Sequence, residues 1–181
     1  MKTILTIVAS LLIIVLAFLW YSGAFTSVNV EETLAGGYKV AGLEFTGSYS
    51  KAGEYIEKVD KKLKKLGFNC SKGFGIYYDD PKTTSQEKCR GFVGNILEEK
   101  DLNKLLEIKS IGLKIDSIPK SKAVAVQFKA NTFLSYAIGP MKTYPVISKY
   151  INENKYKVLY SLEVYDMPKK RITYMMLISA Q

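Results

Sequence analysis

The feature that most constrains the fold of this chain is an internal repeat. A strand, a helix and two further strands are predicted over residues 36–97, and the same order of elements returns over residues 122–181. The segment IYYDDP aligns with EVYDMP, which pairs Tyr78 with Tyr165. One βαββ unit is too small to cover both faces of its own sheet, so the two units are expected to join. The sequence therefore predicts an α+β domain with one antiparallel-type sheet, two helices on one face and a concave, open face opposite.

The elements inside the two halves follow from periodicity and from residues that stop helices. Residues 51–66 carry apolar side chains at helical spacing with lysines on the other face, and Gly67 ends this predicted helix. The second helix is predicted over residues 141–153, directly after Pro140. Residues 98–121 then form a connector between the two halves.

The N-terminal segment is long and apolar enough to cross a membrane. Residues 4–25 carry no charge, and about 20 apolar residues span a bilayer as a helix. We expect residues 1–25 to form a single-pass anchor. A cleaved signal peptide is the alternative, although the apolar run exceeds the usual length of about 7–15 residues. Residues 26–35 are then a linker, and residues 36–181 are the domain.

The charges that flank this segment predict its orientation. Lys2 precedes the apolar run, whereas Glu31 and Glu32 follow it. Because positively charged flanks stay in the cytoplasm, the domain is expected on the non-cytoplasmic side of the membrane.

The composition excludes several kinds of site. The chain has no His among its 181 residues, which removes the commonest general base and metal ligand. Cys70 and Cys89 are predicted to be separate thiols, because they lie near opposite ends of a predicted hairpin. The net charge of +9 suits anionic lipid or nucleic acid, but no aromatic residues alternate with the helix lysines, so nucleic-acid binding is not expected. Asp79-Asp80 before Pro81 is interpreted as a turn and not as a metal-binding pair.

One acidic residue stands out in the last predicted hairpin, residues 157–179. Glu163 interrupts a strand, and burial of a carboxylate costs free energy unless the carboxylate is paired. Alternation divides this strand into two sets of side chains. The set predicted to lie under the helices is Val158, Tyr160, Leu162 and Val164. The set predicted to line the open face is Leu159, Ser161, Glu163 and Tyr165, joined through the repeat by Phe74, Ile76 and Tyr78.

This arrangement predicts a pocket in which Glu163 provides the charge and Tyr165, Tyr78, Ile76 and Phe74 provide the walls. A carboxylate among aromatic rings suits a cationic, partly apolar ligand. The same carboxylate serves as a general acid or base if its pKa is raised. The alternative is a solvated Glu beside a Lys or Arg on an open face. Three residues remain open between cleft and core because their register is not fixed: Phe92, Tyr174 and Met176.

The βαββ duplication, with LEVYDMP near its end, resembles the GyrI-like small-molecule-binding domain family, which has an SHS2-type fold. That family includes the drug-sensing domains of transcription regulators. Within it, a Glu in an E-[IV]-Y-x-x-P setting lies in the ligand cleft, and Glu163, Tyr165 and Pro168 match this pattern. The resemblance covers nearly the whole chain from Gly37 onward.

The segments GIYYDDPK, CRGFVGNIL, YINENKYK and LEVYDMP resemble more closely a membrane-anchored subgroup, the testis-expressed ER-phagy receptors. Each of these receptors carries one such domain behind an N-terminal anchor, which is the arrangement that this chain resembles. The receptors also have a long C-terminal tail that recruits the autophagy machinery. We expect this chain to lack that tail, because it ends at Gln181 after its last predicted strand. Neither the autophagy role nor the regulator role is therefore expected.

The sequence predicts a membrane-anchored, sensor-like and monomeric module, without metal or cofactor, that binds an amphipathic or cationic small molecule between its halves. Two other functions stay open. One is hydrolysis of a strained ring, which the resemblance to some GyrI-like proteins implies and in which Glu163 would activate water. The other is a protein-interaction scaffold. Binding is favoured over catalysis because Glu163 has no recognisable catalytic partner.

Overall fold

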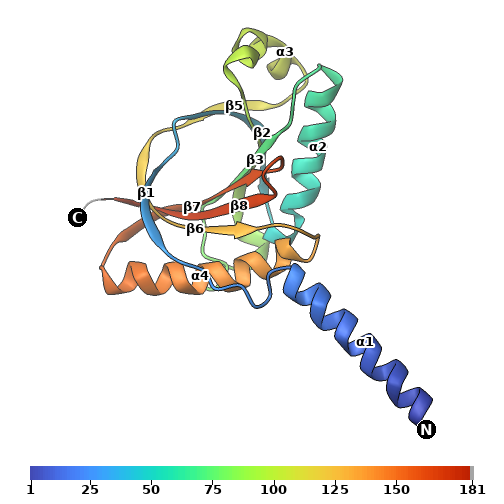
Figure 1. Cartoon of the computed structure of the whole chain (residues 1–181). Helices are drawn as coiled ribbons and strands as arrows, with labels where there is room; N and C mark the ends of the chain where they lie inside the picture. Colours follow the sequence, from blue (N-terminus) through green and yellow to red (C-terminus); the bar gives the residue numbers. More distant parts are fainter. Residues whose placement is uncertain (180–181) are drawn as a thin grey trace.

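The structure is a computed structural model that describes residues 1–179, and its central feature is one curled sheet (Figure 1). Within these residues the sheet has eight strands in the order β1-β6-β8-β7-β3-β4-β2-β5, and each pair of neighbours is antiparallel. The strands are β1 (Glu31–Ala35), β2 (Tyr38–Thr46), β3 (Lys72–Tyr77), β4 (Arg90–Ile96), β5 (Lys114–Ile118), β6 (Ser121–Lys129), β7 (Lys157–Asp166) and β8 (Arg171–Ser179). The α-helices are α1 (Lys2–Tyr21), α2 (Ala52–Lys65), α3 (Leu105–Ser110) and α4 (Ser135–Glu153). The predicted α+β class is confirmed.

One continuous ladder curls this sheet into a half-barrel. β1 pairs with β6 from Glu31 opposite Ala125, and β2 pairs with β5 as far as Gly42 opposite Lys114. The residue-to-residue pairing continues without a shift from the first pair of strands into the second. β1 and β2 therefore act as one bent strand, and β5 and β6 act as the bent strand paired with it. Gly36 sits at the bend with φ of +91°, where a Cβ would stand 2.1 Å from a backbone oxygen. Only glycine suits this position.

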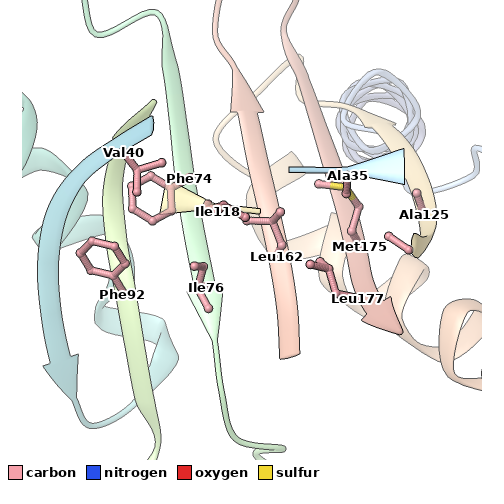
Figure 2. Packing of buried hydrophobic residues seen from close by; sticks show 11 residues of the cluster. Ala35, Val40, Phe74, Ile76, Phe92, Ile118, Ala125, Leu162, Met175 and Leu177 are labelled. Carbon is pink, nitrogen blue, oxygen red and sulfur yellow. The ribbon is translucent and has the colours of Figure 1, made fainter. Parts of the chain in front are cut away.

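The concave side of the half-barrel holds an apolar cluster that the sheet encloses (Figure 2). Leu162 and Leu177 are fully buried there without any helix over them. The other large members come from strands across the sheet: Val40, Phe74, Ile76, Phe92, Ile118 and Met175. Burial of such side chains contributes about 1.5–3 kcal/mol each.

Two helices, α2 and α4, cover the opposite, convex side, as predicted. α2 packs through Val59 and Leu63, and α4 packs through Ile147 and Ile151. The convex side of β7 carries Glu163 and Tyr165, because Tyr165 packs with the α4 cluster and Tyr144 of α4 bonds to Glu163. The predicted face assignment within β7 is therefore wrong. The set predicted to lie under the helices instead faces the concave side: Tyr160, Leu162 and Val164 all pack with that cluster.

Three elements depart from the sequence prediction. β1 lies inside the segment predicted as a linker, and β5 lies inside the predicted connector 98–121. Both strands are short, and each is ordered by pairing with a strand that is distant in the sequence: β1 with β6, and β5 with β2. α4 starts at Ser135 and contains Pro140 and Pro145, although Pro140 predicted a start at residue 141. Residues 180–181 of the predicted second half lie outside the described residues.

The segment after α1 is fixed to the domain by hydrogen bonds. Ser22 is fully buried, its Oγ accepts a 2.8 Å hydrogen bond from Thr132 Oγ1, and its carbonyl accepts a 3.0 Å bond from Ser135 Oγ. Asn131 Nδ2 donates to the carbonyl of Tyr21 at 3.0 Å, and Lys142 Nζ donates to the carbonyl of Ala24 at 2.7 Å. The end of α1 is therefore held against the start of α4, while the rest of α1 extends away from the domain (Figure 1).

Candidate functional site

Glu163 lies on β7, in the middle of the strand order, and its side chain is on the convex side of the sheet, where Tyr144 of α4 contacts it. It stands opposite Gly75 of β3 and Tyr174 of β8. Gly75 leaves room for the neighbouring ring, because a Cβ at this position would stand 2.7 Å from the hydroxyl oxygen of Tyr77. Glu163 is 7% exposed, which is unusual for a carboxylate.

Tyrosine hydroxyls surround this carboxylate. Tyr144 of α4 donates a 2.7 Å hydrogen bond to Oε1, and Tyr165 donates to Oε2. The hydroxyls of Tyr77 and Tyr165 are 3.1 Å apart, and since Tyr165 gives its proton to Glu163, Tyr77 must be the donor between them. Tyr174 packs against Tyr144 with ring centroids 5.7 Å apart. No ion pair among the described residues includes Glu163.

The electrostatics of the cluster follow from this burial. Desolvation raises the pKa of Glu163, and the hydrogen bonds from Tyr165 and Tyr144 offset only part of the increase. Desolvation, together with the nearby charge of Glu163, also raises the pKa of Tyr144 and Tyr165 well above the usual range. The tyrosines are therefore neutral donors, and the carboxylate is the group that a bound cation would stabilise.

The structure divides the five predicted site residues between two faces. Glu163 and Tyr165 lie on the helix-covered side, whereas Phe74, Ile76 and Tyr78 lie on the concave side. The register explains the division, because Ile76 stands opposite Leu162 and only Gly75 stands opposite Glu163. The prediction that the five line one pocket is therefore wrong, while the binding role of each stays a prediction. The three open residues also divide: Phe92 is concave, and Tyr174 and Met176 pack with the α4 cluster.

A separate small cavity of about 120 Å³ lies at the mouth of the concave side. Ile76 and Tyr78 line it together with Tyr160, whose ring centroid is 6.2 Å from that of Tyr78. Asp116 of β5 contributes its polar side. This cavity is about the size of a single aromatic ring. Glu163 and the tyrosines that bond to it are not among its lining residues.

A larger cavity of about 290 Å³ lies beside the tyrosine cluster. Tyr136 at the start of α4 lines this cavity, and its ring centroid is 6.4 Å from that of Tyr165. The hydroxyl of Tyr136 also donates to Met167 Sδ at 3.6 Å. Tyr136, which is 42% exposed, lines the cavity and contacts Tyr165, whereas Tyr165 and Glu163 are not among the lining residues.

Sequence reasoning missed Tyr77 and Tyr144. Tyr144 lies in a segment that was predicted to be helical, but no pattern indicates which helical residue reaches across to β7. Tyr77 was passed over for its neighbour Tyr78, although alternation places these two on opposite faces. Alternation places Tyr77 on the same face as Gly75, but only the register with β7 shows that Glu163 shares this face.

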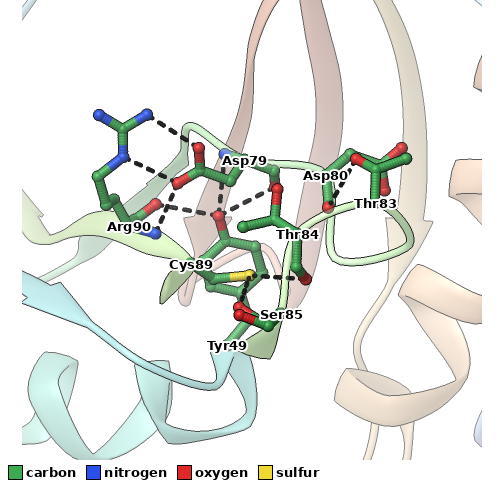
Figure 3. A network of polar contacts seen from close by, with 8 residues as sticks. All are labelled: Tyr49, Asp79, Asp80, Thr83, Thr84, Ser85, Cys89 and Arg90. Carbon is green, nitrogen blue, oxygen red and sulfur yellow. Dashed lines mark hydrogen bonds and ion pairs between the residues drawn. The ribbon is translucent and has the colours of Figure 1, made fainter. Parts of the chain in front are cut away.

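Asp79 and Asp80 belong to a structural network at the end of β3 (Figure 3). Asp79 accepts two hydrogen bonds from the guanidinium of Arg90, and Asp80 Oδ1 accepts from the backbone N–H of Lys82 at 2.9 Å. The hydroxyl of Tyr49 donates to the carbonyl oxygens of Asp79 and Arg90. Hydrogen bonds from the Arg90 side chain hold the pKa of Asp79 below its usual range. The predicted turn is confirmed.

The two cysteines are free thiols, as predicted. Cys89 is buried and donates to the carbonyl oxygens of Thr84 and Ser85 (Figure 3). Burial raises the pKa of Cys70 to about 11, so its thiol is protonated near neutral pH.

The sequence of this chain matches one family model over most of its length. The model describes the GyrI-like small-molecule-binding domain and matches residues 29–174. The chain belongs to this family. It is 31% identical over 163 residues to testis-expressed protein 264 homolog of Mus musculus, which covers 84% of this chain and 50% of that protein. It is 30% identical to testis-expressed protein 264 of Homo sapiens, with 86% and 50% covered, so the chain spans about half the length of the curated relatives it matches.

Three solved structures share the fold. The EcmrR C-terminal domain aligns with a TM-score of 0.60 at 12% identity, covering 85% of this chain and 99% of that chain. EcmrR in its DNA complex aligns with a TM-score of 0.59 at 13% identity, covering 99% and 69%. SAV2435 bound to tetraphenylphosphonium aligns with a TM-score of 0.51 at 10% identity, covering 84% and 94%. At such identities the likeness extends to the fold alone.

Proposed function

We propose that this protein is a membrane-anchored, sensor-like domain that binds a cationic, partly apolar small molecule at Glu163. The observation that carries the proposal is a carboxylate 7% exposed whose hydrogen-bond donors are the hydroxyls of Tyr144 and Tyr165. A buried carboxylate without a positive partner costs free energy. A cationic ligand would offset that cost, and rings such as Tyr174 would add cation–π attraction.

The ligand would enter through the cavity beside Tyr136. That cavity holds about 290 Å³ and is lined in part by Phe133, Tyr136 and Met167. Rotation of the Tyr136 ring would uncover Tyr165, which contacts Glu163 directly. The apolar part of the ligand would then rest against these three side chains while its charge meets the carboxylate. The relative SAV2435 was solved with a lipophilic cation, tetraphenylphosphonium, which supports the choice of this class of ligand.

The anchor in this proposal is α1. Its 20 residues, Lys2–Tyr21, are long and apolar enough to cross a membrane, and none of its side chains is buried against the domain. A signal sequence near the N-terminus passes the same test. The flanking charges of Lys2, Glu31 and Glu32 favour a domain on the non-cytoplasmic side.

A thermal-unfolding experiment tests the ligand site. The full chain in lipid nanodiscs would be unfolded with tetraphenylphosphonium and, separately, with the neutral triphenylphosphine oxide. The variant Glu163→Gln removes the charge, and Glu57→Gln makes the same change at an exposed position of α2. A ligand at about 100 times its Kd stabilises the folded state by about 2.7 kcal/mol. We expect tetraphenylphosphonium to raise the Tm of the natural chain and of Glu57→Gln.

The outcome for Glu163→Gln decides the proposal. The cation should leave its Tm unchanged, because the charge that binds the cation is absent. Partition of the cation into lipid is the same for all three proteins and so does not explain a difference between them. An equal rise in Glu163→Gln would show that the cation binds elsewhere. No rise in the natural chain would contradict the choice of a lipophilic cation.

A further inference from the structure

The exposed face of α4 is apolar where a surface helix is normally charged. Buried residues recur along α4 at every fourth position from Ser135 to Ile151. A second row of exposed residues, also four apart, lies on the opposite side of the helix and begins in the turn before it. We call the uncharged part of this row and the lysine that follows it the α4 outer stripe: Phe133, Ala137, Met141, Pro145 and Lys149. The next residue of the row, Glu153, ends α4 and pairs with Lys149 at 3.8 Å. Phe133 is 80% exposed and Met141 is 77% exposed.

α2 provides the contrast within the same molecule. Apart from Gly53, every exposed residue of α2 is Glu or Lys. Such a charged face is what an amphipathic helix presents to water. The α4 outer stripe has four uncharged residues and one lysine, so the two helices face different surroundings.

The position of α1 identifies those surroundings. The segment after α1 is fixed to the start of α4 through Ser22, as described above. Phe18, in the last turn of α1, lies with its ring centroid 6.3 Å from that of Phe133. A bilayer crossed by α1 would therefore have its surface beside Phe133, at the beginning of the stripe. The amine of Lys142 lies at the same place, bound to the carbonyl of Ala24.

We infer that the α4 outer stripe rests in the interface of the membrane that α1 crosses. Phe133 and Met141 would enter the boundary between headgroups and acyl chains. Lys149, which pairs with Glu153 at 3.8 Å in the structure, would bind lipid phosphates in place of that exposed partner. Apolar residues with a flanking lysine are typical of helices that lie in this interface. The inference rests on the anchor of the proposed function, but not on the ligand at Glu163. α4 would lie between the membrane and the tyrosine cluster.

Tryptophan fluorescence in vesicles tests this placement on the full chain. Trp20 at the end of α1 is the only tryptophan in the sequence, so the natural chain reports on the anchor itself. In the Trp20→Phe background, Met141→Trp reports on the stripe and Ala137→Trp provides a second position on it. Leu106→Trp is the matched control, since Leu106 is 82% exposed on α3. The vesicles would contain phosphatidylcholine and phosphatidylserine with brominated acyl chains, which quench only tryptophans in the bilayer.

The expected result is that Trp20 and Met141→Trp lose most of their emission and that the emission of Met141→Trp shifts to the blue. Leu106→Trp should keep its emission. If Trp20 is quenched while both stripe variants behave like Leu106→Trp, the anchor stands and the inference is overturned. If Trp20 is not quenched, the anchor fails and the inference fails with it. Thermal unfolding of each variant beside the natural chain verifies that the substitutions leave the fold intact.

Discussion

Substitution of Glu163 by Gln is expected to stabilise the unliganded chain at neutral pH. The carboxylate is 7% exposed, and desolvation raises its pKa above the usual value. Because the folded state then binds the proton more tightly than the unfolded state, the stability of the natural chain falls as pH rises from the unfolded pKa to the folded pKa. Below both values Glu163 is protonated in both states, and the natural chain and the variant should be equally stable.

The size of the effect follows from the same linkage. Each unit of pKa increase costs about 1.4 kcal/mol once the group is ionised. For a chain of this length, 1 kcal/mol corresponds to about 2–4 °C in Tm, so each unit should appear as about 3–6 °C. The amide of Gln accepts from one tyrosine and donates to the other, so the bonds with Tyr144 and Tyr165 are retained.

Thermal unfolding followed by circular dichroism, between about pH 4 and pH 8, measures this difference. Glu57→Gln is a control of opposite sign, because its hydrogen bond and ion pair with Lys61 lower the pKa of Glu57. Its deficit relative to the natural chain should therefore grow with pH. If Glu163→Gln is less stable than the natural chain at neutral pH, and more so as pH rises, the tyrosines stabilise the ionised carboxylate and the reasoning is refuted.

Three further predictions concern the core and the thiols. Leu162→Ala in the concave cluster should cost about 2–5 kcal/mol in chemical denaturation, whereas Leu106→Ala on the surface should stay within about 0.5 kcal/mol of the natural chain. Gly139→Ala would place a Cβ 2.2 Å from the hydroxyl of Tyr174 and should cost about 1–3 kcal/mol in the same assay; an unchanged midpoint would show that Tyr174 moves freely. Cys70, with its pKa of about 11, should react with iodoacetamide near neutral pH only after unfolding, and rapid labelling of the native chain would contradict this.

The fold was largely predictable because the repeat sets the order of its elements. The predicted helix over residues 51–66 is α2, Ala52–Lys65, and the final hairpin is β7 and β8. The start of α4 was not predictable, because Pro140 is a strong local stop signal. The helix nevertheless continues through Pro140, and Gly139 lies close to Tyr174 of β8, a contact with a distant segment that no local pattern predicts.

The faces of the strands were not predictable from alternation alone. Alternation divides β7 into two sets, but both sides of this sheet are buried, one by helices and one by its own curl. The repeat alignment paired Tyr78 with Tyr165, and these residues lie on opposite faces. A shift of one residue moves every side chain of a strand to the other face. An alignment error of this size therefore placed Phe74, Ile76 and Tyr78 wrongly on the face of Glu163.

The ladder that closes the half-barrel also constrains how the chain is made. β1 and β2 emerge from the ribosome early, yet their partners β5 and β6 are synthesised only after α2, β3, β4 and α3. Until then, the edge from Glu31 to Gly42 has no partner and is available to other nascent chains. Contacts of this sequence separation also slow folding, because a long loop must close first. A truncation that ends before Lys114 should therefore aggregate during synthesis instead of yielding a folded half-domain.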